Sequence, residues 1–299
     1  MAAQSVKNST HLTPNGKGWG VETENAPQEQ HVHNGTVASG NGISYHGGPV
    51  MTESSVNIYF IWYGKWNSTG SNSQTTVNLL DTLFGAGGLG GSQYEGINTT
   101  YGDNTSNVSG NLALLKSTTD SYSQGTRFGD SGVLAIVTRA INNGSLPNDP
   151  GGVYFVLTSS DVKETSGFCT RYCGWHTNGT INGSDIKYAF VGNPDRCPSA
   201  CEAQTTSPNG DSGADGMASV MAHESEEAIS DPDLNAWYDS AGNENADKCA
   251  WKWGPTQTAA NGSKYNQTLA GHQWLIQMNW ENASGGGCEQ VLGGPFYTN

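Results

Sequence analysis

The stretch His223-Glu224-Ser225-Glu226-Glu227-Ala228-Ile229-Ser230-Asp231-Pro232 carries the most information in this chain of 299 residues. If the segment is helical, His223 and Glu227 project from one face, one turn apart, because residues four apart are neighbours on a helix. Glu224 then lies beside them. The segment therefore predicts a helix that presents an imidazole and two carboxylates together.

The flanking residues set the limits of this helix. Small and apolar residues at 218–222 are suited to a buried helix, and residues 213–217 are typical of a loop leading into it. Pro232 should end the helix, because the residue before a proline disfavours the α conformation. We therefore expect an active-site helix at about 215–230, whose buried polar side chains need partners.

The pattern is that of the HExxH helix of zinc hydrolases, with Glu in place of the second His. In such a helix two side chains hold the metal and the intervening Glu exchanges protons with the attacking water. His223 and Glu227 are thus predicted Zn²⁺ ligands, and Glu224 is the predicted catalytic base. An oxygen-rich site would also admit calcium or manganese. The alternative is an acidic, solvated helix.

Three downstream carboxylates are candidates for a further ligand. Glu244 and Asp247 lie 17 and 20 residues beyond Glu227, a spacing that resembles the thermolysin-like gluzincins. Asp233 has the metzincin spacing, six residues after Glu227, but its neighbours fit that pattern poorly. We favour Glu244, with Asp247 as a co-ligand or as the acceptor that fixes the His223 tautomer. The alternative for Glu244 and Asp247 is a capped turn held by a nearby cysteine.

Composition excludes some partners. The formal net charge is −14 with only 13 Lys and Arg, which leaves no basic stripe for nucleic acid. No apolar run approaches the roughly 20 residues that span a bilayer. Gly contributes 41 residues and charged residues only 13%, which predicts many loops and turns. We expect a monomer with one domain at 41–299, after an N-terminal arm at 1–40 that is draped over the core or disordered.

Two features predict secretion to the extracellular space or the cell wall. Six cysteines, an even number, are typical of disulfides in an oxidising compartment. Asn-x-Ser/Thr sequons, the acceptors of N-glycosylation, are also frequent. The cysteines are Cys169, Cys173, Cys197, Cys201, Cys249 and Cys288, and the sequons begin at Asn8, Asn34, Asn67, Asn98, Asn104, Asn107, Asn143, Asn178, Asn182, Asn261, Asn266 and Asn282.

Six cysteines allow fifteen pairings, so sequence alone does not fix the connectivity. We favour two bridges within residues 169–201 and one joining Cys249 to Cys288. The last bridge would pin the segment carrying Glu244 to a C-terminal strand. The Cys-x-x-x-Cys spacings at 169–173 and 197–201 leave a structural zinc cluster as the alternative.

Apolar patterning predicts a mixed α/β fold (α+β), with helices laid on a mixed sheet and long loops such as 85–130 between elements. Thr75 to Phe84 has the spacing of an amphipathic helix. The runs that predict strands are 56–62, 132–138, 153–158, 187–191 and 274–280. Together with the helix at 215–230, this pattern predicts a zincin-like single domain held by disulfides.

Several strings in order from about residue 45 to 290 resemble the phosphate-induced protein 1 / EXORDIUM family. The resemblance implies an extracellular, cell-wall-associated protein and leaves the biochemical activity open. It is to the microbial members, which share the His-Glu-x-x-Glu stretch that plant members lack, and the sequons favour a fungus. The strings are Tyr45-His46-Gly47-Gly48-Pro49-Val50, Ile58 to Gly64, Val153 to Ser159, Phe168-Cys169 through Cys173-Gly174, Cys197-Pro198, Pro208 to Asp211 and Asn235-Ala236-Trp237-Tyr238.

The other histidines carry weaker signals. His176 follows Cys173-Gly174-Trp175 and would line the cleft as a transition-state donor, or make a structural hydrogen bond in a disulfide-tied loop, which we favour. His46 lies in a Gly-rich turn and is read in the same way. His31 and His33 would chelate adventitious metal.

The sequence thus predicts a secreted metal-dependent hydrolase, specifically a zinc endopeptidase acting on extracellular or cell-wall protein. Glu224 would take a proton from the attacking water and return it to the leaving amine. One alternative is a non-catalytic cell-wall or glycan-binding protein with a structural calcium site. A second is a glycosidase that uses paired carboxylates such as Glu224 and Glu244.

Overall fold

The computed structural model describes residues 13–17, 42–283 and 285–297, and its centre is a five-stranded mixed sheet. The strands β3, β2, β5 and β8 run parallel, and β7 pairs antiparallel with β8 at one edge. Strands β2 and β5 are buried along almost their whole length, as expected for parallel strands covered on both faces. In sheet order the strands are β3 (Leu112–Asp120), β2 (Val56–Tyr63), β5 (Gly152–Thr158), β8 (Ser184–Gly192) and β7 (Gly174–Ile181).

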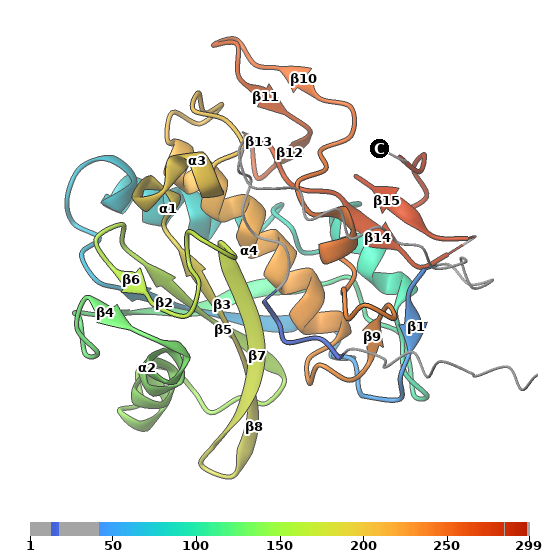
Figure 1. The fold of residues 1–299 in the computed structure, drawn as a ribbon, viewed down its shortest axis with the longest axis horizontal. Coiled ribbons are helices and arrows are strands. Elements are labelled where there is room, and N and C mark those ends of the chain that lie inside the picture. Colours follow the sequence, from blue (N-terminus) through green and yellow to red (C-terminus); the bar gives the residue numbers. More distant parts are fainter. Residues whose placement is uncertain (1–12, 18–41, 284, 298–299) are drawn as a thin grey trace, which may run out of the picture.

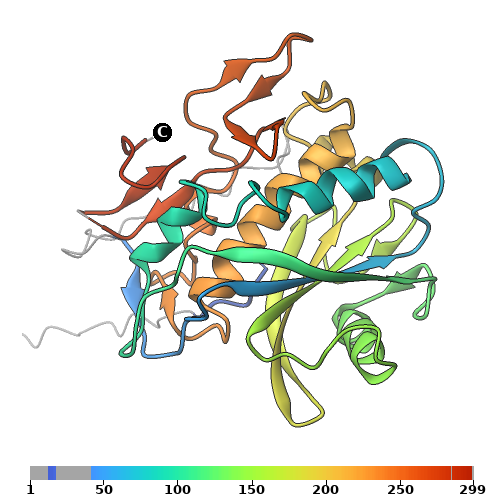
Figure 2. The same ribbon diagram turned by 180° about the vertical axis from the view of Figure 1, so that it is seen from behind.

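Helices cover both faces of this sheet (Figures 1 and 2). The long helix α4 (Ser212–Ser230) and the shorter α1 (Gln74–Leu83) lie on one face, and α2 (Asp130–Asn142) lies on the other. Helix α4 is buried from Gly213 to Ser230, because the sheet, α1 and the C-terminal hairpins surround it. The buried helix required by the sequence motif is therefore the central element of the fold.

Short elements complete the chain, and the hairpins after residue 255 form a layer beside α4 (Figure 1). The two-stranded pairs are β1 (Ser44–Tyr45) with β9 (Trp237–Tyr238), β4 (Arg127–Phe128) with β6 (Lys163–Glu164), β10 (Gln257–Thr258) with β11 (Lys264–Tyr265), β12 (Gln267–Leu269) with β13 (His272–Trp274), and β14 (Asn279–Glu281) with β15 (Gly287–Glu289). The short helices are η1 (Gly70–Asn72), η2 (Glu95–Thr100), η3 (Pro194–Arg196), α3 (Pro198–Cys201) and η4 (Asp247–Cys249).

The mixed α/β prediction is confirmed, as are the helix predicted at 75–84 and three of the predicted strands. Helix α4 ends at Ser230, as Pro232 predicts, but it begins at Ser212, so residues 213–217 are helical rather than a loop. The Asp211 side chain caps the N-terminus of α4 by accepting a hydrogen bond from Ala214 N at 3.0 Å.

Three predictions of local structure were wrong. The run 132–138 is part of α2, because its buried residues recur every three or four positions and not every two. The run 274–280 is divided between β13 and β14. The predicted loop 85–130 contains η2 and β3. Strand β3 lacks the apolar pattern of a buried strand, because it is an edge strand with many exposed polar residues.

Three disulfides join the cysteines as predicted. Cys169 pairs with Cys197, Cys173 with Cys201, and Cys249 with Cys288. No free cysteine is present among the described residues, so the alternative of a zinc–thiolate cluster was wrong. The first two bridges tie the start of β7 to η3 and α3, and the third ties η4 to β15.

Most of the arm predicted at 1–40 lies outside the described residues, as do the sequons at Asn8 and Asn34. Of the described segment 13–17, Gly16 accepts a hydrogen bond from His176 N through its carbonyl oxygen at 3.0 Å. Across the described part of the chain, no helix is long and apolar enough to cross a membrane.

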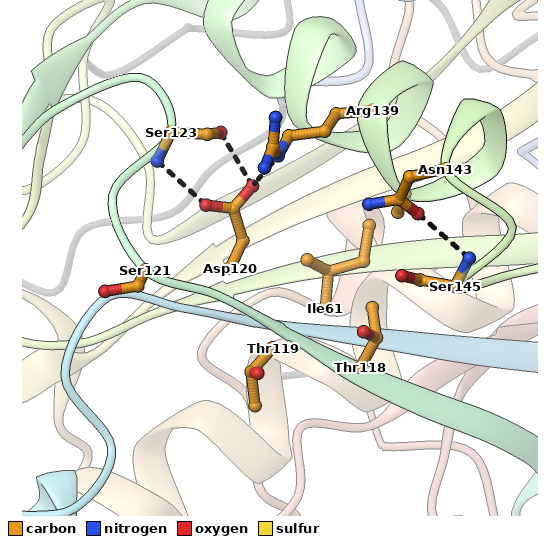
Figure 3. A pocket seen from close by; sticks show the side chains of 10 residues that line it. Ile61, Thr118, Thr119, Asp120, Ser121, Ser123, Arg139, Asn143 and Ser145 are labelled. Atoms are coloured by element: carbon orange, nitrogen blue, oxygen red, sulfur yellow. Dashed lines mark hydrogen bonds and ion pairs between the residues drawn. The ribbon is translucent and has the colours of Figure 1, made fainter.

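A surface pocket of about 270 Å³ lies where β2 and β3 meet α2 (Figure 3). Its acidic residue, Asp120, accepts hydrogen bonds from Ser123 N at 2.8 Å and Ser123 Oγ at 2.6 Å. Arg139 Nε lies 3.8 Å from Asp120 Oδ2. The charges of this pocket are therefore already paired with each other.

Candidate metal centre

Helix α4 brings His223 and Glu227 together as the sequence spacing predicts. His223 Nε2 lies 3.1 Å from Glu227 Oε1 and 3.5 Å from Asp247 Oδ1. The backbone N–H of Asp247 also donates to Glu227 Oε1 at 2.9 Å. His223, Glu227 and Asp247 thus form a first group of possible metal ligands, which we call group A.

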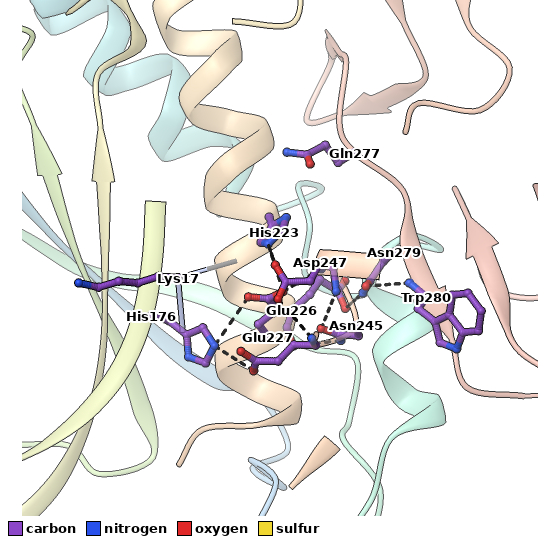
Figure 4. A network of polar contacts seen from close by, with 12 residues as sticks. Lys17, His176, His223, Glu226, Glu227, Asn245, Asp247, Gln277, Asn279 and Trp280 are labelled. Carbon is purple, nitrogen blue, oxygen red and sulfur yellow. Dashed lines mark hydrogen bonds and ion pairs between the residues drawn. The ribbon is translucent and has the colours of Figure 1, made fainter. Parts of the chain in front are cut away.

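A second group forms around the other oxygen of Glu227, and it includes a histidine that the sequence analysis assigned elsewhere. His176 Nε2 lies 3.1 Å from Glu244 Oε1 and 3.7 Å from Glu227 Oε2. The ligand atoms of His176, Glu227 and Glu244, which we call group B, lie within 4.8 Å of one another. Figure 4 shows His176 projecting from β7 and His223 from α4 toward the same carboxyl group.

Strand β7 can deliver His176 because α4 packs closely against it. A Cβ atom added to Gly174 would come within 2.5 Å of Val220 Cγ1 and 2.9 Å of Glu224 Oε1. Such distances are shorter than carbon–carbon and carbon–oxygen contacts allow. Glycine at 174 therefore lets the helix side that bears Glu224 approach the strand that bears His176.

The acidic residues 244 and 247 reach the helix through a turn and a disulfide. Asp231, at the end of α4, accepts hydrogen bonds through Oδ1 from Asn235 N and Ala236 N, both at 2.6 Å, which fixes the turn after the helix. The chain then passes through β9 and returns at η4, where Cys249 is bonded to Cys288. The predicted bridge therefore holds Asp247 against α4.

Burial governs the electrostatics of the two groups. It lowers the pKa of His176 to about 3 and raises the pKa of Glu227 to about 7, the latter helped by the negative charge of Asp247. Burial opposes the charged form of His223, but the surrounding carboxylates raise its pKa well above the ordinary value. Burial thus favours the neutral forms of His176 and Glu227, while the carboxylates favour the charged form of His223.

Burial also raises the pKa values of Glu244 and Glu224. Burial, with the nearby charge of Glu227, raises the pKa of Glu244 well above its ordinary value. Burial also raises the pKa of Glu224, against the pull of His223. Burial thus favours the protonated forms of both side chains, and metal binding would require their deprotonation.

Several polar atoms in the cluster have no hydrogen-bond partner among the described residues. They include Glu224 Oε2, Glu227 Oε2 and Asp247 Oδ1, all on residues that are nearly or fully buried. Buried polar atoms without partners are rare in proteins and suggest a missing ion or water. Ligand atoms bound tetrahedrally to zinc at 2.0–2.1 Å lie about 3.3 Å apart, so the measured separations of 3.1–3.7 Å suit a shared ion.

The remaining candidates lie outside both groups. Asp233 Oδ1 lies 3.1 Å from Lys187 Nζ and accepts a hydrogen bond from Asn178 Nδ2 at 3.3 Å. His46 Nε2 lies 3.1 Å from the carbonyl oxygen of Tyr238, and its ring stacks on the Tyr238 ring. The sequence therefore located Asp247 and Glu244 correctly beside the helix but gave no spacing signal for His176, which reaches the cluster only through the pairing of β7 with β8.

The described sequons differ in exposure. Asn98 is fully buried, and its Nδ2 donates to the carbonyl oxygen of Glu226 at 3.1 Å, which leaves no room for a glycan on that nitrogen in the folded chain. Asn178, Asn266 and Asn282 are half-buried. The exposed ones are Asn67, Asn104, Asn107, Asn143, Asn182 and Asn261.

Comparison with known proteins gives consistent matches along most of the chain. The family model of the phosphate-induced protein 1 conserved region matches residues 43–290. Protein EXORDIUM-like 5 of Arabidopsis thaliana is 31% identical over 274 residues, which cover 80% of this chain and 75% of that protein. Protein EXORDIUM-like 3 of the same plant is 32% identical over 278 residues, which cover 80% of each chain. No solved structure matches the chain significantly.

Proposed function

The chain belongs to the phosphate-induced protein 1 family, and we propose that it is a secreted, metal-dependent hydrolase, most specifically a zinc endopeptidase acting on extracellular or cell-wall protein. The proposal places it in a microbial, fungal branch of the family that uses the HExxE helix in a zincin-like manner. Its main support is the buried Glu224, whose Oε2 has no hydrogen-bond partner among the described residues, beside group A.

The donor set of group A fits zinc. One imidazole and two carboxylates are ordinary zinc ligands, and three protein ligands with an open position are typical of catalytic zinc sites. His223, Glu227 and Asp247 would hold the ion, in place of the set with Glu244 that the sequence favoured. When bound there, zinc would supply Lewis-acid polarisation of water and of the scissile carbonyl.

Glu224 would act as the general base and acid. Its carboxylate takes a proton from the attacking water and passes it to the nitrogen of the leaving amine as the peptide bond breaks. A pKa raised by burial suits this role, because a base that returns its proton works best when its pKa lies nearer the working pH than that of an exposed Glu.

Two measurements test the proposal. Protein purified without added metal should contain zinc that is lost in His223→Ala, as read by elemental analysis. Glu224→Gln should retain the metal and lose proteolysis of extracellular or cell-wall protein by a factor of about 10²–10⁴. Glu226→Gln alters a carboxyl that is next to Glu227 in the sequence but belongs to neither group, and it should retain both metal and turnover. Full turnover in Glu224→Gln would contradict the mechanism.

One observation favours a second function, that of a non-catalytic cell-wall or glycan-binding protein with a structural cation. The side chains of the cluster are closely covered, since His223, Glu224 and Asp247 are only 5%, 4% and 8% exposed. A closed, oxygen-rich site is typical of a structural ion such as calcium. This function predicts calcium in the purified protein and unchanged behaviour of Glu224→Gln.

A further inference from the structure

The two oxygens of the Glu227 carboxylate face different histidines. Oε1 lies 3.1 Å from His223 Nε2 on α4, and Oε2 lies 3.7 Å from His176 Nε2 on β7. We propose that the chain binds two divalent transition ions, with Glu227 bridging them: group A holds one ion, and His176 and Glu244 of group B complete the site of the other. This inference rests on the proposed metal centre and extends it from one ion to two.

The geometry of group B supports a ligand role for His176. The separation of 3.7 Å between His176 Nε2 and Glu227 Oε2 is too long for a hydrogen bond, yet Glu227 Oε2 is buried and has no hydrogen-bond partner in the part of the chain that the structure describes. Both distances of the group, 3.1 and 3.7 Å, bracket the roughly 3.3 Å expected between two ligands of one zinc ion. A cation between His176, Glu227 and Glu244 would satisfy the unpaired oxygen.

The membership of the two groups also supports two ions. Groups A and B have only Glu227 in common, and each contributes one imidazole and one further carboxylate. If a single ion were served by group A alone, the 0%-exposed His176 and the 1%-exposed Glu244 would remain buried beside it without a cationic partner. A carboxylate that offers one oxygen to each histidine is suited to bridge.

Charge balance supports the same number of ions. Among the described residues, the ion pairs of Glu227, Glu244 and Asp247 are all with histidine and none is with Lys or Arg. With Glu224 the cluster holds four buried carboxyl groups. One divalent ion carries the charge that balances two ionised carboxylates, and two ions carry the charge that balances all four, so full ionisation of this buried cluster calls for two ions.

A two-ion site would change the expected chemistry of the proposed hydrolase. For peptide hydrolysis, two ions held there would share the activation of the attacking water and the stabilisation of the negative charge on the carbonyl oxygen, while the amine nitrogen leaves with the proton from Glu224. His176 would then hold an ion instead of donating a hydrogen bond to the transition state. Imidazole with carboxylates suits zinc, iron and, where oxygen predominates, manganese.

The decisive measurement is the number of zinc ions per chain in the full-length protein. The protein should be stripped with chelator, saturated with zinc, desalted and analysed for metal and for protein concentration. Because His31 and His33 are spaced to hold adventitious metal, every variant should carry His31→Ala and His33→Ala. We expect two zinc ions per chain in this background, one in His176→Ala and one in Glu244→Gln.

Glu95→Gln is the matched control, because it alters a buried carboxyl outside both groups and should retain two ions. Near-ultraviolet circular dichroism checks that each variant is folded. If His176→Ala does not fold, Glu244→Gln alone tests the second site. The cobalt-substituted protein gives an independent readout, with visible absorption that saturates after two equivalents.

Each outcome decides a different point. One zinc per chain in the background protein, unchanged in His176→Ala, overturns the two-ion inference while the single-ion proposal stands. No zinc overturns both. Two ions that persist in both His176→Ala and Glu244→Gln would place the second ion elsewhere and also overturn the inference.

Discussion

Two adjoining sides of helix α4 hold buried carboxyl groups in different surroundings. On one side Glu227 lies between His176 and His223, within the two candidate metal groups. On the other side Glu226 lies beside Glu95 of η2 and accepts a hydrogen bond from Asn279 Nδ2 at 2.5 Å. Glu226 and Glu227 are adjacent in the sequence and equally buried.

The difference teaches how a fold can keep a buried acid. Beside Glu226 there is another carboxyl and an amide, so a proton retained between the two acids supplies the missing donor, and burial raises the pKa of Glu95 to about 8. Beside Glu227 there are two imidazoles, one near each oxygen of its carboxylate. Burial of carboxylates alone therefore does not distinguish the two sides of α4, whereas the imidazoles that face both oxygens of Glu227 do.

The largest expected effect is the loss of zinc affinity when Glu227, but not its neighbour Glu226, is replaced by Gln. Glu227→Gln replaces the carboxylate shared by both groups with a neutral amide, so zinc affinity should fall by more than about 100-fold, since losses of 10–100-fold already follow changes in residues that only support ligands. Glu226→Gln should leave zinc affinity within a few-fold of the natural chain. Competition with a chromophoric chelator measures both.

Equal losses of affinity in Glu226→Gln and Glu227→Gln would contradict the comparison. They would mean that the helix as a whole, and not the side facing the histidines, determines metal binding. A folded state must be verified for each variant, because a misfolded Glu227→Gln would lose metal for another reason.

Removal of metal by a chelator should also distinguish Glu226→Gln from Glu227→Gln, through a smaller effect on Tm. A ligand present at 100 times its Kd stabilises the folded state by about 2.7 kcal/mol, which corresponds to several degrees in Tm for a domain of this size. Chelator should therefore lower the Tm of the natural chain and of Glu226→Gln. In Glu227→Gln the Tm should not respond, and differential scanning fluorimetry with and without zinc provides the measurement.

The sequence predicted one side of α4 better than the other. His223, Glu224 and Glu227 follow from a spacing of one helical turn, and Glu244 and Asp247, predicted from their spacing beyond Glu227, lie within reach of it. Such local signals survive folding because helix geometry fixes them.

Contacts that depend on strand order could not be predicted in this way. His176 reaches Glu227 because β7 lies at the sheet edge, antiparallel to β8, and because Gly174 admits the helix. Glu95 meets Glu226 because η2 folds back over α4 from a segment that looked like a loop. Neither pairing has a fixed spacing in the sequence.

The smallest expected effect is a pH dependence of stability that arises on the Glu226 side. The pKa of Glu95 in the folded chain, about 8, lies above its ordinary value of 4.5. Between these values the unfolded chain is ionised while the folded chain keeps the proton, so the unfolded state binds fewer protons and the free energy of unfolding falls as pH rises. Below about 4.5 both states hold the proton, and above about 8 neither does. Glu95→Gln removes this contribution.

The Tm of Glu95→Gln, measured relative to the natural chain, should therefore rise between pH 5 and pH 8. The rise should be progressive across this range, because each step in pH costs the natural chain more of this contribution. The exposed Glu53→Gln is the control and should follow the natural chain across the range. A Tm difference for Glu95→Gln that stays constant with pH would show that Glu95 ionises freely when folded, and the contrast between the two sides of α4 would then lie in the histidines alone.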